Sequence, residues 1–279
     1  LVAPLDWGLG HITRCIPIVN ELVRAGCTVW VAGNKKGLAL MRQEFPGIST
    51  LDIEGYNVIY HPSKKRFSLK IFMQIPKILG RIRWENRWLK RVLKAHDFDV
   101  VISDNRFGLY NKTAYCIFIT HQLHIKSGRG KWVDWIIEKV NYRYINRFNE
   151  CWVPDFAGSH NLSGELSHGG LVPHNTRYIG PLSRFEKKAV EKKYGLLVLL
   201  SGPEPGRTNW EKKLLQELMC YEGRACIVRG LPGVEEQITC GKNIDIVNHL
   251  PSGELNLAIQ QSEWVICRSG YTSVMDLMV

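Results

Sequence analysis

The C-terminal segment, residues 264–276, places hydroxyl, glycine and carboxylate side chains directly after an apolar strand pattern. The strand pattern ends at Cys267, and the residues that follow it predict a helix. With about 3.6 residues per turn, one face of this helix carries four polar side chains, Ser269, Thr272, Ser273 and Asp276. Amides at a helix N-terminus bind phosphate, and a nearby carboxylate accepts hydrogen bonds from ribose hydroxyls. The pattern indicates a nucleotide; a capped helix with a polar outer face is the alternative interpretation.

A glycine loop near the start of the chain is the second candidate site. Gly8, Gly10 and His11 follow the first strand pattern and open the first helix pattern. The two glycines allow a tight turn and a close approach of the backbone. A helix N-terminus favours the neutral imidazole, which can act as general base toward a hydroxyl nucleophile. Thr13 breaks the glycine pattern of a nicotinamide site. A histidine near a helix cap with no chemical role is the alternative for His11.

Two further loops follow strand patterns in the second half of the chain. Ser201 and Gly202 precede a predicted helix, so their amides can contact a phosphate or a sugar. An ordinary strand-to-helix turn is the alternative for this loop. Leu250 follows another short strand, where its main-chain N–H and C=O can read a nucleobase. Both loops therefore join the terminal segment as candidate parts of one nucleotide site.

Alternating strand and helix patterns position these loops. The first series predicts strands at residues 1–5, 28–32, 49–53, 100–103, 116–120, 151–153 and 177–179, and helices at 11–25, 36–44, 76–95, 132–147 and 158–166. The second series predicts strands at 196–200, 225–228, 245–247 and 264–267, and helices at 209–221, 252–261 and from 271 onward. Such alternation indicates an α/β fold with parallel sheets covered on both faces. We expect two doubly wound, Rossmann-like domains, 1–182 and 183–279, facing across a ligand cleft at the carboxyl ends of their strands.

Composition narrows the class of protein. The chain has 279 residues, of which 45% are hydrophobic and 23% charged, as in soluble globular proteins. It contains no apolar run of the roughly 18–20 residues that span a membrane. Both ends interrupt predicted elements, so we expect a longer protein. The eight cysteines form no Cys-x-x-Cys pair, which favours reduced thiols in a cytoplasmic protein and argues against a zinc site.

The net charge of +11 is concentrated in one predicted helix region. Between positions 64 and 94 there are eleven Lys and Arg residues and one acidic residue, Glu85, which gives 11 − 1 = +10. An apolar stripe lies opposite the basic residues, and tryptophans flank them. Such a helix suits an anionic membrane surface, with the contacts predicted at Trp84, Arg87, Trp88 and Arg91. A solvated helix face is the alternative, and nucleic acid is the least favoured partner because no binding module accompanies the basic residues.

Together these motifs resemble the GT-B glycosyltransferases, and most closely the family 28-like enzymes that include the N-acetylglucosaminyltransferase of peptidoglycan lipid II synthesis. The glycine loop with Gly-His matches at Gly8, Gly10 and His11. The nucleotide-sugar segment matches at Arg268, Ser269, Gly270, Ser273 and Asp276, where the family usually has Glu in place of Asp. The resemblance implies that Asp276 holds the ribose, that the Leu250 backbone reads uracil and that Arg184 lies near the diphosphate.

The resemblance implies transfer of a hexose from a UDP-sugar to an acceptor hydroxyl, with a lipid-linked acceptor as one option. Helix amides and a basic side chain would offset the charge of the departing diphosphate. We expect no metal ion and no cofactor, His11 as the base, and a cytoplasmic cell-envelope enzyme docked on the inner face of the membrane. A UDP-sugar 2-epimerase and a non-catalytic protein that binds nucleotide sugars or membranes are the alternatives.

Overall fold

The computed structural model describes residues 1–6, 8–56, 64–202 and 204–278. The chain divides into two compact units. The first comprises Leu1–Trp7, Ile18–Leu38 and Ile48–Leu182, and the second comprises Gly8–Pro17, Ala39–Gly47 and Ser183–Val279. The division into domains 1–182 and 183–279 stays a prediction.

The first unit is built on a parallel sheet. Its seven described strands are β1 (Val2–Pro4), β2 (Trp30–Gly33), β3 (Ser49–Asp52), β4 (Val100–Asp104), β5 (Tyr115–Ile119), β6 (Glu150–Val153) and β7 (Thr176–Tyr178). Their spatial order is β3-β2-β1-β4-β5-β6-β7, and each pair is parallel. The order reverses direction between β1 and β4, the place where open α/β sheets leave a crevice for ligands. The predicted strands of this half are thereby confirmed.

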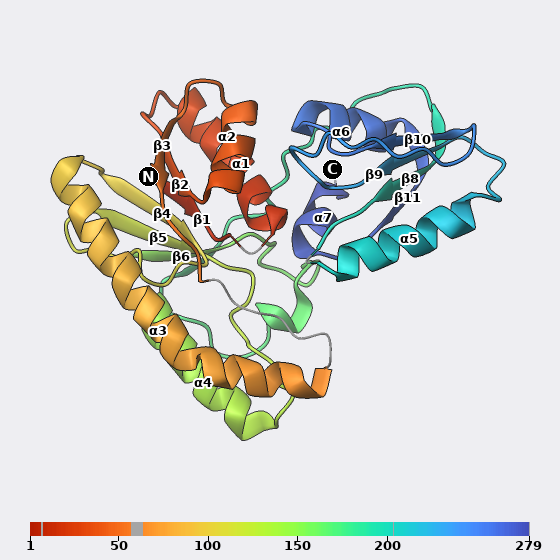
Figure 1. Cartoon of the computed structure of the whole chain (residues 1–279). Coiled ribbons are helices and arrows are strands. Elements are labelled where there is room, and N and C mark those ends of the chain that lie inside the picture. Colours follow the sequence, from red (N-terminus) through yellow and green to blue (C-terminus); the bar gives the residue numbers. More distant parts are fainter. Residues whose placement is uncertain (7, 57–63, 203, 279) are drawn as a thin grey trace. The chain divides into compact units, whose positions relative to one another are not determined.

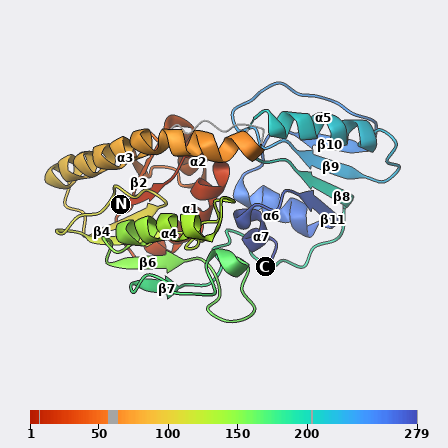
Figure 2. The same ribbon diagram turned by 90° about the horizontal axis from the view of Figure 1, so that it is seen from below.

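Helices cover both faces of this sheet (Figures 1 and 2). The helices α1 (Leu9–Arg24) and α2 (Lys35–Glu44) lie on one face, and α3 (Lys64–Ala95) and α4 (Lys131–Ile145) lie on the other. The main apolar core joins α3 and α4 to the strands through Leu89, Phe118 and Ile145. Of the helix predicted at 158–166, only a 3-10 turn at Gly164–Leu166 forms.

The second unit contains a smaller parallel sheet. Its four described strands are β8 (Tyr194–Leu199), β9 (Ala225–Val228), β10 (Ile244–Val247) and β11 (Ser262–Cys267), in the order β10-β9-β8-β11. Alternate residues of β8 point to opposite faces: Leu197 packs with α6 (Ser252–Gln260), and Val198 packs with α5 (Gly206–Leu218). A short helix, α7 (Tyr271–Asp276), follows β11. Parallel sheets covered on both faces confirm the predicted α/β class.

Two sequence predictions for α3 are wrong. Pro76 does not open the helix but lies inside it, because the helix already begins at Lys64. Trp88 is buried in the main core, and Trp84 packs against the same core with the Arg81 guanidinium 3.9 Å above its ring. Trp88 therefore forms no outer membrane contact, and a contact of the partly buried Trp84 stays a prediction. Arg87 and Arg91 are exposed, as expected for the basic face of the helix.

A buried ion pair anchors α3 to the loop after β4. The Arg106 guanidinium donates to the Glu85 carboxylate at 2.9 Å, and both side chains are fully buried. Arg106 also donates to the carbonyl oxygens of Pro4 and Glu54, and the Tyr56 hydroxyl donates to Glu85 at 2.8 Å. Burial raises the pKa of Glu85, although Arg106 opposes this shift. The network holds the carboxyl ends of β1 and β4 in place.

Over the part of the chain that the structure describes, every helix is too short or too polar to span a bilayer. No disulfide joins the eight cysteines, all of which lie in described residues.

We predict that Arg106→Leu destabilises the first unit by about 3–5 kcal/mol, because it leaves the Glu85 carboxylate buried without a cation. Urea unfolding followed by circular dichroism measures this change. Adding Glu85→Gln to Arg106→Leu should recover part of the loss, since no charge is then buried. The control is Arg24→Gln, which breaks an exposed ion pair with Glu21 and should cost at most about 1 kcal/mol. Equal losses for the two arginine variants would contradict the prediction.

Candidate functional site

The loops after the four strands of the second sheet gather at one edge, because all four strands are parallel. Strands β8 and β11 are neighbours, and Cys267 pairs with Leu199 in their register. The loop with Ser201 and Gly202 therefore begins beside the loop with Arg268. Ser269 and Gly270 continue this second loop and are exposed, and Ser273 is half-buried on α7. The structure thus brings together the predicted loop residues of β8 and β11.

Arg268 packs directly on the Gly202 loop. A Cβ atom added at Gly202 would lie 2.3 Å from the Arg268 Nη1 atom, and one added at Gly206 would lie 3.3 Å from Nη2. The guanidinium also lies 5.5 Å from the centroid of the Trp210 ring. Gly202 has a φ of 101°, which disfavours other residue types. The turn therefore favours glycine at position 202, and its missing side chain leaves room for the Arg268 guanidinium, which lies at the start of α5.

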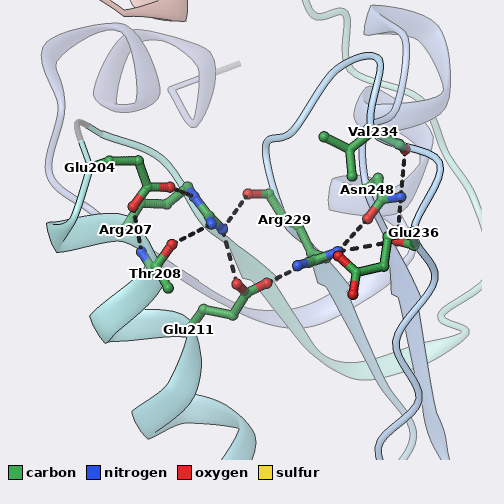
Figure 3. Close-up of polar contacts among 8 residues, drawn as sticks. All are labelled: Glu204, Arg207, Thr208, Glu211, Arg229, Val234, Glu236 and Asn248. Atoms are coloured by element: carbon green, nitrogen blue, oxygen red, sulfur yellow. Dashed lines mark hydrogen bonds and ion pairs between the residues drawn. The ribbon is translucent and has the colours of Figure 1, made fainter.

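A chain of charged residues, of which Arg207, Glu211 and Arg229 are buried, supports these loops (Figure 3). Glu211 of α5 accepts hydrogen bonds from Arg207 at 3.1 Å and from Arg229 at 2.5 Å. Arg207 reaches Glu204 at 2.6 Å, and the Glu204 carboxylate caps the amide of Thr208. One carboxylate thus fixes both the loop after β8 and the residue that follows β9. Sequence reasoning missed this network, although Arg207 and Glu211 have the spacing of neighbours on one helix face.

The network continues to the loop between β9 and β10. Arg229 donates to the Asn248 side-chain oxygen at 2.7 Å, and Asn248 donates to the carbonyl oxygens of Val234 and Glu236 at 2.7 and 2.9 Å. Asn248 and Val234 line a cavity of about 390 Å³. The charged network therefore shapes one wall of this cavity.

His249 also lines the cavity. Burial lowers the pKa of His249, and the nearby Arg184 charge lowers it further, so the ring is neutral at pH 7. Its Nε2 atom is buried without a hydrogen-bond partner. The next residue, Leu250, packs its side chain on the core of the second unit, which leaves its main chain for any contact with a ligand. A planar group with polar edges, such as a nucleobase, suits a cavity with these properties.

Asp276 already has protein partners. Its carboxylate accepts hydrogen bonds from the Ser183 hydroxyl at 3.1 Å and from the Arg184 amide at 3.4 Å. The Arg184 Nε atom lies 3.5 Å away, an ion-pair distance that makes no hydrogen bond. Burial raises the pKa of Asp276, although Arg184 opposes this shift. Arg184 therefore joins Asp276, and a ribose could reach this carboxylate only by exchanging these partners.

His11 lies in the first turn of α1, after Gly8 with a φ of 81°. Its Nδ1 atom is 2.8 Å from the buried Arg14 guanidinium, and the Thr272 hydroxyl, also in the second unit, donates to the Gly10 carbonyl at 3.1 Å. A guanidinium has only donors, so Nδ1 is the acceptor and the proton of the neutral ring sits on Nε2. In this arrangement His11 is a hydrogen-bond donor, and it becomes a base only after Arg14 releases Nδ1. Sequence reasoning missed Arg14.

Metal ligands were not expected. The sequence nevertheless contains one Asp-x-Asp pair, Asp97 and Asp99, which precedes β4 and which our sequence analysis overlooked. Both residues line a cavity of about 550 Å³ at the amino ends of β1, β2 and β4, opposite the edge where ligands bind in such sheets. Among the described residues, no three His, Cys, Asp or Glu side chains are placed to hold a metal ion together.

Comparison with solved structures gives the fold family. The glycotransferase of kitacinnamycin superposes with a TM-score of 0.62 at 13% identity, over 99% of this chain and 76% of that chain. The spinosyn rhamnosyltransferase SpnG gives a TM-score of 0.62 at 14% identity over the same shares. Arabidopsis thaliana UGT89C1 complexed with UDP-L-rhamnose gives 0.56 at 13%, over 99% and 75%. The fold is GT-B.

No protein-family model matches the chain, and no curated protein matches it by sequence. The structural neighbours are glycosyltransferases of natural products and plants, and the expected membership of the family 28-like enzymes is not confirmed.

We predict that Gly202→Ala displaces the Arg268 guanidinium and weakens binding of a nucleoside diphosphate at least about tenfold, as loss of a charge-assisted hydrogen bond would. Isothermal titration with UDP measures this affinity, and Arg268→Gln should give a similar loss. The control is Gly26→Ala, since Gly26 lies outside the proposed donor site and has a comparable φ of 77° but open space around its Cβ position. If the control weakens UDP binding as much as Gly202→Ala, backbone strain explains the loss, and the role of Arg268 is wrong.

Proposed function

We propose that this chain is a glycosyltransferase that moves a hexose from a UDP-sugar to an acceptor hydroxyl. The observation that carries the proposal is the loop edge of the second sheet, where the Arg268 guanidinium lies on the Gly202 loop at the start of α5. A cation in such a place suits a diphosphate that gains negative charge as it leaves. The GT-B fold, shared with a plant enzyme complexed with UDP-L-rhamnose, supports the choice of donor.

For the donor, we assign the cavity beside His249 to the uracil. The unpartnered Nε2 of His249 and the main chain of Leu250 supply polar groups at a cavity of suitable size. Ser201, Gly202, Arg268, Ser269 and Gly270 face the diphosphate in this proposal. Asp276 and Ser273 bind the ribose once Asp276 exchanges its bonds to Ser183 and Arg184, and Arg184 then adds a second cation.

For the acceptor, we assign His11 as the base that takes the hydroxyl proton. Deprotonation requires the lone pair of Nδ1, which the Arg14 guanidinium occupies in this structure. The acceptor hydroxyl then takes the place of Arg14, and the proton passes to the ring as the sugar C1–O bond forms and the bond to UDP breaks. Gly8 and Gly10 let the backbone approach the acceptor closely.

The finer parts of the proposal concern acceptor and location. We propose a lipid-linked acceptor and a metal-independent mechanism, as in the family 28-like enzymes that the motifs resemble. The exposed basic face of α3, with Arg87 and Arg91, favours a place on the inner surface of the cell membrane. UGT89C1 was also solved in complex with quercetin, so a small-molecule acceptor is the competing candidate.

We predict that the protein releases UDP from one UDP-hexose in a panel of UDP-sugars, and only when an acceptor is present. A coupled assay for UDP, run with lipid-linked, glycan and flavonoid acceptors and with a chelator, identifies both substrates. Conversion of a UDP-sugar to its 2-epimer without an acceptor would instead indicate an epimerase. UDP binding without any turnover would indicate a nucleotide-sugar-binding protein, and both results contradict the proposal. Loss of turnover with the chelator would contradict metal independence.

We predict that His11→Ala lowers kcat by about 10²–10⁴-fold, the usual contribution of a general base, and leaves UDP affinity almost unchanged. His11→Gln is the matched variant, because a glutamine side chain can donate a hydrogen bond but cannot take the proton. Both variants should therefore lose turnover equally. Substantial activity in His11→Gln alone would show that His11 acts as a donor, as its contact with Arg14 would allow, and would end its assignment as base.

A further inference from the structure

Helix α4 turns an apolar stripe toward solvent. Trp132, Trp135, Ile136 and Val140 are 73, 52, 37 and 49% exposed. They follow one another at spacings of three, one and four residues, which places them on one face of the helix. Single exposed apolar residues are ordinary on a protein surface, but a continuous stripe with two tryptophans marks an interaction site.

The inner face of α4 carries several polar side chains beside the buried Ile145, which is unusual for a surface helix. Glu138 is 3.0 Å from the buried His124 ring, and the Tyr142 hydroxyl is 3.2 Å from the same Nδ1 atom. The buried Asn141 side chain donates to the carbonyl oxygen of Leu123 at 3.2 Å, and Asp134 accepts hydrogen bonds from Ser127. These contacts determine which face of the helix is inside. The apolar stripe cannot rotate into the core without breaking them.

The charged residues on the same outer face of α4 are all positive. Lys131, Lys139 and Arg143 are exposed, and both acidic residues of the helix, Asp134 and Glu138, are engaged on the inner side. Lys139 lies over the Trp135 ring, with Nζ 4.8 Å from its centroid. Long cationic side chains can lie along apolar surface and keep their charges at its rim. The outer face of α4 thus combines apolar side chains with cations, because Lys139 and Arg143 lie among the apolar residues and Lys131 lies beside them.

We propose that this face of α4 is a docking surface for an anionic membrane. Tryptophan prefers the interface between headgroups and acyl chains, and cations beside it attract anionic lipids. Arg87 and Arg91 of α3 add positive charge to the same unit. The inference deepens the proposed function, because it rests on an enzyme that works at a membrane and names the surface that reaches it. It replaces Trp84 and Trp88, which pack on the core, with Trp132 and Trp135.

Sedimentation with vesicles tests the proposal on the full chain, without any sugar donor. The protein should bind vesicles of phosphatidylcholine with phosphatidylglycerol, and bind pure phosphatidylcholine at least about tenfold more weakly. Trp132→Ser with Trp135→Ser should weaken binding to the anionic vesicles at least about tenfold, because their apolar surface no longer enters the interface. Lys139→Gln with Arg143→Gln should weaken it severalfold and reduce its dependence on salt.

Matched controls come from the second unit. Trp264 is 72% exposed, so Trp264→Ser removes a comparable ring and should leave binding unchanged. Lys212→Gln with Lys213→Gln removes two exposed cations from α5 and should also have little effect. Far-UV circular dichroism and thermal melting confirm that each variant folds, as expected for exposed positions. A second measurement tests whether the two rings enter the bilayer. Brominated lipids should quench the tryptophan fluorescence of the native chain more than that of Trp132→Ser with Trp135→Ser.

Three results would overturn the proposal. The first is equal binding to vesicles with and without anionic lipid. The second is equal loss of binding in the α4 and Trp264 variants. The third is a dimer that forms without lipid and disappears in the α4 variant, which would assign the face to a second copy of the chain. Because the assay contains no UDP-sugar, a failure of vesicle binding leaves sugar transfer untouched, and an inactive protein that binds vesicles leaves the docking surface standing.

Discussion

Parallel pairing of every described strand is the constraint on which the candidate site depends. It sends the carboxyl ends of β8, β9, β10 and β11 to one edge, so four loops separated by many residues become neighbours. The register of Cys267 with Leu199 then sets Arg268 beside the Gly202 loop. In another register, Arg268 would not lie beside the Gly202 loop.

Buried ion pairs hold the loops that the parallel strands bring together. Glu85 with Arg106 fixes a loop of the first unit, and Glu211 with Arg207 and Arg229 fixes two loops of the second. Such pairs contribute little net stability, because desolvation costs nearly as much as the attraction returns. Their value lies in geometry, since a carboxylate that must satisfy two guanidinium groups leaves few arrangements for the loops that carry them. The polar interior is therefore concentrated beneath the loops.

Sequence patterns predicted most of the strands and helices because alternation of buried strands with amphipathic helices is a local signal. They did not predict the start of α3 at Lys64, since Pro76 resembles a first-turn residue until the preceding turns are known to be helical. They also missed the contact of Arg14 with His11 and the charged network around Glu211. Each depends on side-chain directions and on packing between elements, for which spacing along the chain carries little information.

Helix α4 shows why hydrophobic periodicity alone cannot decide which face of a helix is buried. Its apolar stripe, with Trp132 and Trp135, would ordinarily be placed in the core, because burying a large apolar side chain is worth on the order of 2 kcal/mol. The structure instead buries Asn141 and holds Glu138 against His124. Turning the helix over would bury the rings but would leave these polar groups without partners, at a cost of about 1–3 kcal/mol for each group that stays buried. The gain from burying the rings and the cost of the unpaired polar groups are comparable. A partner surface that covers the stripe from outside would bury the rings and leave the polar contacts intact.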